Sequence, residues 1–284
     1  MLMNRYIIVA IIAAISLGAG GYFFFNSQKN TTSTSQGHNM DMSGKPVAQS
    51  HRSYELEVTT STDNVQPNQP VNFSYKVKND QGAILKNYQT VYEKIMHFIV
   101  VRKDLQKFQH IHPDFNQQSG EFTVSITFPT DGSYRIFPDF TPGDENPQNL
   151  PVTVYKDITV GDISKYSPQQ VAVDTNPKKT FDGYNITFST NPEPKAQTNF
   201  TYTVKIEQNG QPVTNLENYL GALGHTVILK EGTLDFIHTH AGETGMGPKI
   251  EFSTTFPHSG IYKIFTQFQH QNKVITTDYV IEAK

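Results

Sequence analysis

One internal repeat constrains the fold of this chain more than any other feature. The segment FPTDGSYRIF at 128–137 returns as FPHSGIYKIF at 256–265. Upstream, MHFIVV at 96–101 is matched by GHTVIL at 224–229, and FQHIH at 108–112 is matched by FIHTH at 236–240. A repeat of this length indicates that one structural unit occurs twice. The copies run from about residue 54 to 160 and from about residue 184 to 283.

Each copy reads as a set of short strands. Apolar and polar residues alternate at period 2 in NFSYKV (72–77) and TYTVKI (201–206), and Pro, Gly and Asn separate such runs. Copies of about 100 residues with several strands favour an all-β chain of two tandem immunoglobulin-like or cupredoxin-like β-sandwich domains. The Gly-x-Tyr pairs predict a turn into a strand, with the hydroxyls of Tyr134 and Tyr262 bonded to backbone.

The N-terminal segment predicts membrane insertion. Residues 6–25 are apolar and long enough for a transmembrane helix. Arg5 on the short N-terminal side favours a cytoplasmic N-terminus and an extracytoplasmic body, held at the cell membrane by a single pass. The alternative is a cleaved signal sequence and a secreted or periplasmic protein.

The domain organisation follows from these elements. We expect an anchor or signal at 1–25, a flexible tether at 26–52, a first sandwich at 53–161, a linker at 162–181 and a second sandwich at 182–284. The tether contains His38, Met40 and Met42 in a polar segment without an evident core. Imidazole and thioether ligands together favour copper, so these three are possible tether ligands; an ordinary linker is the alternative.

Six of the ten histidines fall into two sets with the same spacing, His-x12-His-x-His. Their occurrence twice in otherwise diverged copies is stronger evidence for a site than one set alone. The sets are His97, His110 and His112, and His225, His238 and His240.

The spacing predicts that each set shares one face of a hairpin. A two-residue turn at 231 and 232 places His225 opposite His238, with His240 two residues further on the same face. Val227 and Phe236 lie on that face too, so the histidines end a stripe that we expect to face the core.

The first copy gives the same arrangement. A turn centred between Lys103 and Asp104 places His97 opposite His110, with His112 beside them. Any loop of even length about these two centres keeps this arrangement, whereas a one-residue slip would put the histidines on opposite faces.

The two triads predict metal ligation. Three neutral imidazoles suit Cu(II) or Zn(II), and copper has the higher affinity. The alternative is a structural cluster of hydrogen-bonded imidazoles. His51, His258 and His270 have no counterpart in the other copy, so we expect them at the surface.

Composition excludes several classes of protein. The chain has no cysteine, which rules out disulfides, thiolate zinc sites, iron–sulfur clusters and blue copper. A net charge of −3 without a basic patch argues against binding nucleic acid.

The histidine segments resemble a group of uncharacterised bacterial exported β-sandwich proteins related to YtkA-like and copper-context periplasmic proteins. The resemblance covers MHFIVVRKDL at 96–105, FQHIHP at 108–113 and their second-copy counterparts. It implies an exported sandwich in a copper context. Ala241 stands where the first copy has Pro113, so the turn after the second triad is expected to differ.

Three functions remain open. The first is a membrane-anchored extracytoplasmic metal-binding protein that handles copper as a chaperone or buffer, with an extracytoplasmic metal-transport protein as partner. The second is a non-catalytic module that binds protein or glycan, for which the loop at 138–151 is a candidate surface. The third is a zinc hydrolase or hydratase, which the absence of known catalytic motifs disfavours, so we expect no enzyme.

Overall fold

Alternating apolar and polar side chains build the strands of this chain. In β3 (Pro70–Asn79), Phe73, Tyr75 and Val77 are buried and the residues between them are more exposed. The strand β14 (Asn199–Gln208) repeats this pattern in the second copy. Because successive side chains of a strand point to opposite faces, one face of each strand enters a core.

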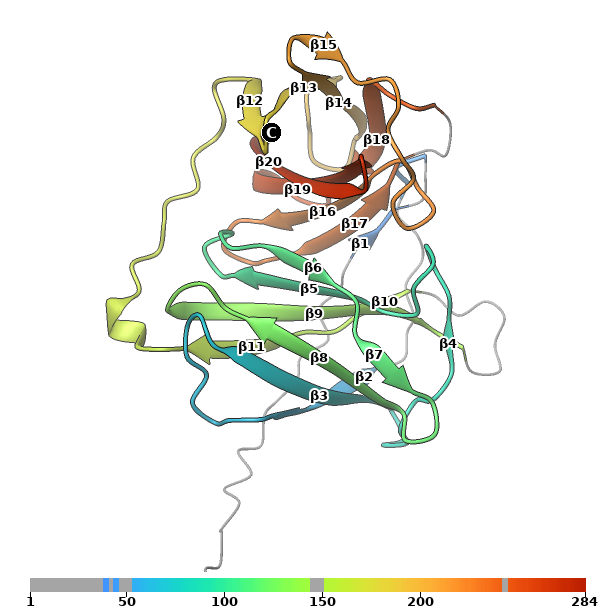
Figure 1. The fold of residues 1–284 in the computed structure, drawn as a ribbon, viewed down its shortest axis with the longest axis vertical. Coiled ribbons are helices and arrows are strands. Elements are labelled where there is room, and N and C mark those ends of the chain that lie inside the picture. Colours follow the sequence, from blue (N-terminus) through green and yellow to red (C-terminus); the bar gives the residue numbers. More distant parts are fainter. Residues whose placement is uncertain (1–37, 41–42, 46–52, 144–150, 242–244) are drawn as a thin grey trace, which may run out of the picture. The chain divides into compact units, whose positions relative to one another are not determined.

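The computed structural model describes residues 38–40, 43–45, 53–143, 151–241 and 245–284 (Figure 1). These residues belong to one compact unit of the chain. No helix within these ranges is long and apolar enough to cross a membrane. The expected anchor at 1–25 lies outside them, as does most of the tether.

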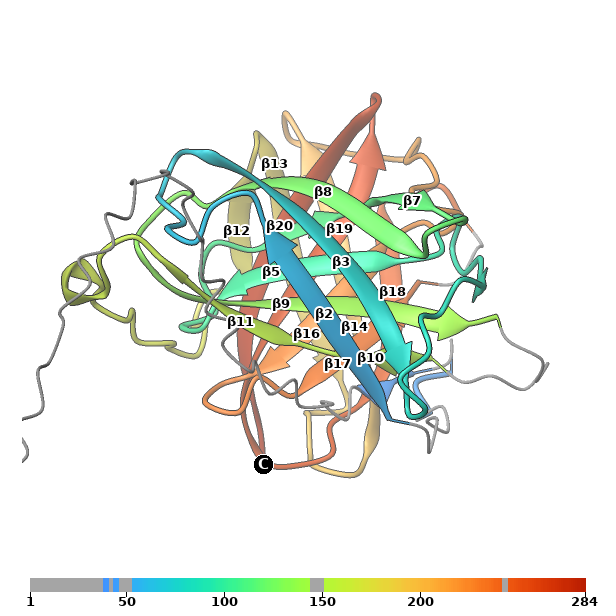
Figure 2. The same ribbon diagram turned by 90° about the horizontal axis from the view of Figure 1, so that it is seen from below.

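The first copy forms a sandwich of two sheets. One sheet has the strand order β2-β3-β8-β7, and the other has the order β10-β9-β5-β6, with β11 and β4 also paired to β9. Figure 2 shows β2, β3 and β8 side by side, crossing obliquely over β5 and β9. The bounds are β2 Tyr54–Thr60, β4 Tyr88–Gln89, β5 His97–Arg102, β6 Gln109–Ile111, β7 Asp114–Asn116, β8 Glu121–Thr127, β9 Gly132–Pro142, β10 Val152–Thr153 and β11 Lys156–Val160.

The second copy repeats this plan. One sheet has the order β12-β13-β14-β15 with β18 paired to β14, and the other has the order β1-β17-β16-β19-β20. The bounds are β1 His38–Asn39, β12 Lys178–Phe181, β13 Tyr184–Asn191, β15 Gln211–Pro212, β16 His225–Lys230, β17 Phe236–His240, β18 Lys249–Thr255, β19 Gly260–His270 and β20 Lys273–Ala283; a 3-10 turn, η1, spans Ile163–Lys165. The predicted all-β chain of two tandem sandwiches is therefore confirmed.

The tyrosines of the Gly-x-Tyr pairs behave as predicted. The Tyr134 hydroxyl donates to the Thr130 carbonyl oxygen at 3.0 Å, and the Tyr262 hydroxyl donates to the His258 carbonyl oxygen at 2.7 Å. Both rings are fully buried, so each hydroxyl needs such an acceptor inside the protein.

The strands β5 and β16 are buried on both faces. Phe98 and Val100 enter the core of the first sandwich, whereas Ile99 and Val101 pack against residues of the second copy. We call this second set the interface core; its buried members are Ile99, Val101, Leu105, Phe137, Val171, Val227, Leu229, Leu234, Phe236, Phe265 and Val280. The stripe that ends in histidines therefore faces the other sandwich and not the core of its own, which corrects our expectation.

The interface core pairs aromatic rings reciprocally. Phe108 of the first copy stacks on Phe265 of the second with ring centroids 4.3 Å apart. Phe137 of the first copy packs against Phe236 of the second at 5.2 Å. In the repeat, Phe108 corresponds to Phe236 and Phe137 corresponds to Phe265, so the same two surfaces meet twice.

Part of the expected tether is built into the second sandwich. The strand β1 pairs in parallel with β17, and the Met40 side chain is buried in the core of that sandwich with 6% of its surface exposed. The Gly44 carbonyl oxygen accepts a hydrogen bond from the Thr255 hydroxyl. The expectation that no core surrounds this segment is wrong for Met40. Met42 lies outside the described residues.

The segment between the sandwiches is also partly structured. At its end, β12 pairs with β13 and so belongs to the second sandwich. Val171 is buried in the interface core, and the Gln169 backbone N–H donates to the Asp104 carboxylate at 3.0 Å.

The register of both histidine hairpins differs from our prediction by two residues. His225 lies opposite His240, and His238 lies opposite Val227. The cause is a four-residue turn in place of the two-residue turn: the Lys230 backbone N–H donates to the Asp235 carbonyl oxygen, which closes the loop.

The first copy shows the same displacement, because Ile99 lies opposite His110 and Phe98 lies opposite Ile111. An even shift preserves the face on which a side chain projects. All three histidines of each set therefore still share one face.

Candidate metal centre

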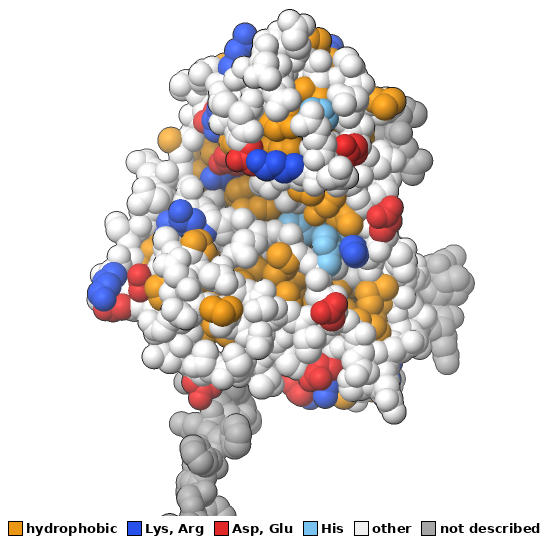
Figure 3. Space-filling model, viewed as in Figure 1, with side chains coloured by type: hydrophobic (Ala, Val, Ile, Leu, Met, Phe, Trp, Pro, Cys, Tyr) orange, Lys and Arg blue, Asp and Glu red, His pale blue; other side chains and the backbone are white. Residues whose placement is uncertain are grey.

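The six histidines lie at one end of the interface core, on the facing sheets of the two sandwiches. Within each triad, one ring nitrogen from each residue lies within 4.8 Å of the others. The predicted triads, His97, His110 and His112 and His225, His238 and His240, are thus each brought together. Histidine side chains reach the surface among hydrophobic ones in Figure 3.

Oxygen acceptors fix the protonation of two rings in the first triad. His97 Nε2 lies 3.1 Å from the Val91 carbonyl oxygen, and His110 Nδ1 lies 2.7 Å from Oε1 of Gln267. These oxygens only accept, so each of those nitrogens carries the ring proton and the other nitrogen of the neutral ring has a lone pair. Those two lone-pair nitrogens, His97 Nδ1 and His110 Nε2, lie 3.1 Å apart.

A metal ion between these two nitrogens would relieve this contact. Two lone pairs that face each other repel, and a proton between them would create a buried imidazolium. Ligands at 2.0–2.1 Å from a tetrahedral metal ion lie about 3.3 Å apart, which is close to the observed separation. His112 Nε2, the third ligand atom, is buried without a hydrogen-bond partner among the described residues.

The second triad is oriented in the same way. His225 Nε2 donates to the Tyr219 carbonyl oxygen at 2.7 Å, and His238 Nδ1 lies 2.7 Å from Oδ2 of Asp139. Their other nitrogens, His225 Nδ1 and His238 Nε2, are buried and have no hydrogen-bond partner among the described residues. The same is true of His240 Nε2. Leaving such groups unpaired costs about 1–3 kcal/mol each.

Burial keeps five of the six histidine rings neutral. Burial and neighbouring histidines hold the pKa values of His97, His110 and His240 well below the ordinary 6.5. Burial lowers the pKa of His225 to about 3, and burial together with Lys94 lowers the pKa of His112 to about 4. Neutral imidazole is the form that binds metal, so these five rings are ready as ligands at neutral pH.

The two triads differ in access. His225 and His238 are 1% and 3% exposed, whereas His110 and His112 are only half-buried. The Tyr92 ring of the first copy stacks on His240 with centroids 3.5 Å apart and covers the second triad. The first triad is therefore the more open of the two.

Sequence reasoning missed the residues that orient the rings. Asp139 lies opposite His97 on β9, and Gln267 lies opposite His225 on β19. Both follow the first histidine of their copy by 42 residues (139 − 97 and 267 − 225), so the repeat alignment already placed them at equivalent positions. Nothing in the sequence indicated that each would contact the other copy.

The remaining histidines agree only in part with the prediction that they lie at the surface. His258 is exposed, as expected. His270 is buried and contacts the Tyr184 hydroxyl at 2.8 Å and Oδ1 of Asn215 at 3.2 Å, so its surface assignment was wrong. His51 lies outside the described residues. Backbone pairing places His38 in register with Ile237.

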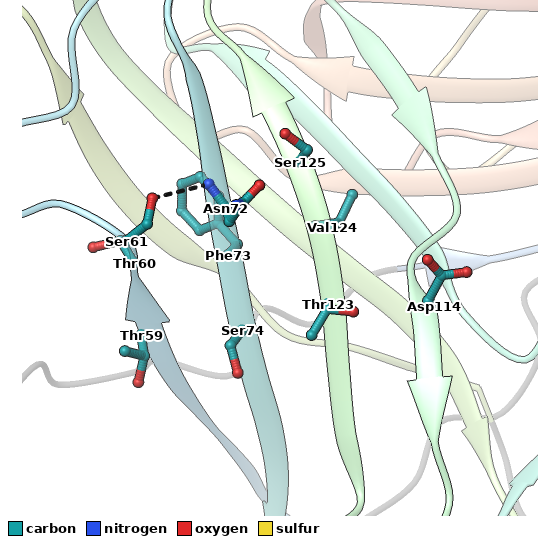
Figure 4. Close-up of a pocket in the computed structure, with 10 residues that line it drawn as sticks. All are labelled: Thr59, Thr60, Ser61, Asn72, Phe73, Ser74, Asp114, Thr123, Val124 and Ser125. Atoms are coloured by element: carbon teal, nitrogen blue, oxygen red, sulfur yellow. Dashed lines mark hydrogen bonds between the residues drawn. The ribbon is translucent and has the colours of Figure 1, made fainter.

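A second feature is an open groove on the outer face of the β2-β3-β8-β7 sheet (Figure 4). It has a volume of about 560 Å³ and contains none of the six histidines. Hydroxyl side chains dominate its lining, and Asp114 is its one carboxylate; the lining residues are Thr59, Thr60, Ser61, Asn72, Phe73, Ser74, Asp114, Thr123, Val124 and Ser125.

Solved structures with some likeness to this chain include FdeC, an adhesin of Escherichia coli, at 11% identity over 84% of this chain and 67% of that chain, with a TM-score of 0.26. Trypsin-activated alpha-2-macroglobulin from Escherichia coli matches at 11% identity over 81% of this chain, with a TM-score of 0.25, and the chain spans 15% of its length. The D0-D1 domain of intimin matches at 13% identity over 79% of this chain and 97% of that chain, with a TM-score of 0.20. Nothing about the function of this chain follows from likenesses so slight.

No curated protein matches the chain. None of these comparisons supports the resemblance to YtkA-like and copper-context proteins, which stays a prediction. A family model described as a domain of unknown function, DUF8832, matches residues 49–157 and 179–284. The matched segments coincide closely with the two sandwiches and cover most of the chain, which therefore belongs to the DUF8832 family and carries its domain twice.

Proposed function

We propose that this protein binds metal ions through its two histidine triads. The observation that carries the proposal is the set of inward-facing ring nitrogens: oxygen acceptors hold the protons on the outer nitrogens, and the inner ones lack donors among the described residues. A structural histidine cluster would instead pair N–H groups with lone pairs. Metal ions supply what these inner nitrogens lack.

Copper is the metal that the ligand set favours, with zinc as the alternative. Neutral imidazoles suit both ions, and Cu(II) binds more tightly than Zn(II) in a given site. The role that fits two such sites is copper handling, as a chaperone or buffer. The tether contributes less to this argument than its composition suggested, because Met40 is buried in the second sandwich.

The cellular setting is part of the proposal. The apolar segment at 6–25 would anchor the protein in the cell membrane with its body outside the cytoplasm, where a metal-transport protein would be its partner. Fractionation of cells that express the full chain, compared with a variant that lacks residues 1–25, tests this placement. Recovery of the full chain in the cytoplasm would contradict it.

Direct metal titration tests the proposed function. We expect purified protein to bind Cu(II) or Zn(II) well below millimolar concentration, and His97→Ala with His225→Ala to weaken binding strongly. His258→Ala is the matched control, because that histidine is exposed and outside the triads. The proposal fails if no ion binds below millimolar concentration, or if the double variant binds like the control.

The groove on the outer sheet favours a second candidate function. A hydroxyl-lined surface of this size suits a non-catalytic module that binds a protein or glycan by hydrogen bonds. Removal of metal with a chelator distinguishes the two functions, because it would leave the binding of such a partner unchanged. Ser74→Trp, a substitution within the groove, would abolish the binding of that partner.

A further inference from the structure

The two triads adjoin each other across the interface between the sandwiches. The His97 ring lies 5.3 Å from that of His238 and 6.1 Å from that of His225, centroid to centroid. The His110 ring lies 6.2 Å from His238 and 6.3 Å from His225. Separations inside one triad span the same range, from 4.4 Å between His238 and His240 to 6.4 Å between His225 and His238.

Each triad is also oriented by the opposite copy. Asp139 of the first copy contacts His238 of the second, and Gln267 of the second copy contacts His110 of the first. These contacts are reciprocal, because the two orienting residues occupy equivalent positions beside the first histidine of their own copy. Both are buried, with 5% and 7% of their surface exposed.

We propose that the six histidines form one binuclear metal centre, in which each sandwich orients a ligand of the ion bound by the other. This inference rests on the proposed metal-binding function and adds to it the number of ions, their proximity and their mutual dependence. One ion would sit in each triad, because each triad alone brings three ligand atoms together.

Charge adds a requirement to this centre. Two divalent ions side by side repel, and Asp139 is the carboxylate that contacts the described ligands. A small bridging anion such as hydroxide, or a pair of Cu(I) ions in place of Cu(II), would reduce this repulsion. The chemical class of the ligand is therefore two copper or zinc ions, with a small bridging anion where both ions are divalent.

Substitution of the orienting residues tests the mutual dependence. In a background with the first triad disabled by His97→Ala and His112→Ala, only the second triad binds metal. We expect Asp139→Ala, although it lies in the first sandwich, to weaken that remaining site 10- to 100-fold, as removal of such a partner does in other metal sites.

The reciprocal test uses the other half. With the second triad disabled by His225→Ala and His240→Ala, Gln267→Ala should weaken the first triad, and Gln267→Glu should restore the acceptor for His110. Asp63→Ala, an exposed carboxylate of the first sandwich, is the control for each series. Circular dichroism and thermal melting identify any variant that fails to fold. If Asp139→Ala fails to fold, it is replaced by Asp139→Asn, which keeps an acceptor and removes the charge.

Electron paramagnetic resonance of the Cu(II)-loaded wild-type protein tests proximity. We expect two ions per chain and either a half-field signal or loss of the Cu(II) signal through coupling. Two ions that give the spectrum of isolated Cu(II), with no effect of Asp139→Ala on the second triad, would overturn the binuclear centre and leave the proposed function intact. A single ion per chain would do the same. No binding at all would overturn the proposed function itself.

Discussion

Acid should destabilise the metal-free protein steeply between pH 7 and pH 5. In the unfolded chain a histidine has a pKa near 6.5 and takes up most of a proton over this range. In the folded protein, burial holds the pKa of His225 at about 3, so that ring stays neutral. The unfolded state then binds more protons than the folded state, and the free energy of unfolding must fall as the pH falls.

The magnitude follows from one ring. For a pKa of about 3 in the folded state against 6.5 in the unfolded state, acidification from pH 7 to pH 5 costs about 2 kcal/mol. The pKa values of His97, His110 and His240 are also held well below 6.5, and that of His112 is lowered to about 4, so these rings act in the same direction. The loss from His225 alone is already a large fraction of the total stability of a typical protein, which is about 5–15 kcal/mol.

Urea denaturation in the presence of a chelator measures this slope. Tyrosine fluorescence and circular dichroism report unfolding, since the chain has no tryptophan. Carboxylates of the unfolded chain titrate near pH 4, below this window, and so do not obscure it. His225→Gln should reduce the loss of stability between pH 7 and pH 5 by about 2 kcal/mol, with His258→Gln as the exposed control. A stability that is constant from pH 7 to pH 5, or a variant that falls as steeply as wild type, would refute the reasoning.

Three further substitutions test the packing that positions the site. Phe137→Ala removes a fully buried ring that packs against Phe236 across the interface. We expect the free energy of unfolding, measured by urea denaturation, to fall by about 3–5 kcal/mol and metal binding to weaken. Unchanged metal affinity would mean that docking of the sandwiches does not support the triads. Tyr134→Phe removes the hydrogen bond to the Thr130 carbonyl and should cost about 0.5–1.5 kcal/mol in the same assay, so a cost near zero would contradict that role. Met40→Ala should lower stability by about 2–5 kcal/mol because this side chain is buried in the core of the second sandwich, and an unaltered denaturation midpoint would contradict that packing.

Local patterns predicted the strands and the faces of the histidines well. Period-2 alternation in β3 and β14 predicts a strand because successive side chains point to opposite faces and only one face of each strand is buried. The shared face of His225, His238 and His240 survived a register error of two residues, because an even shift does not change the face. The turn itself was mispredicted, since glycine at position 232 suits a four-residue loop as well as a two-residue one.

Contacts between distant parts of the chain were beyond such patterns. Ile99 and Val227 lie in apolar runs that predict burial, but such a run does not tell whether the burying surface is the facing sheet of the same sandwich or another sandwich. Asp139 was passed over because its partner, His238, lies 99 residues away. His270 was misplaced for the same reason, as Tyr184 reaches it from β13.

The reciprocal contacts between the copies are those of a symmetric homodimer. In an isologous interface each surface patch meets itself, so any change in one subunit appears twice. Joining the halves in one chain removes that constraint: Asp139 in one half and Gln267 in the other give the two triads different charge, and Tyr92 covers only one of them. A single polypeptide can thus maintain one tight, enclosed site beside one open site, which two identical subunits related by symmetry cannot.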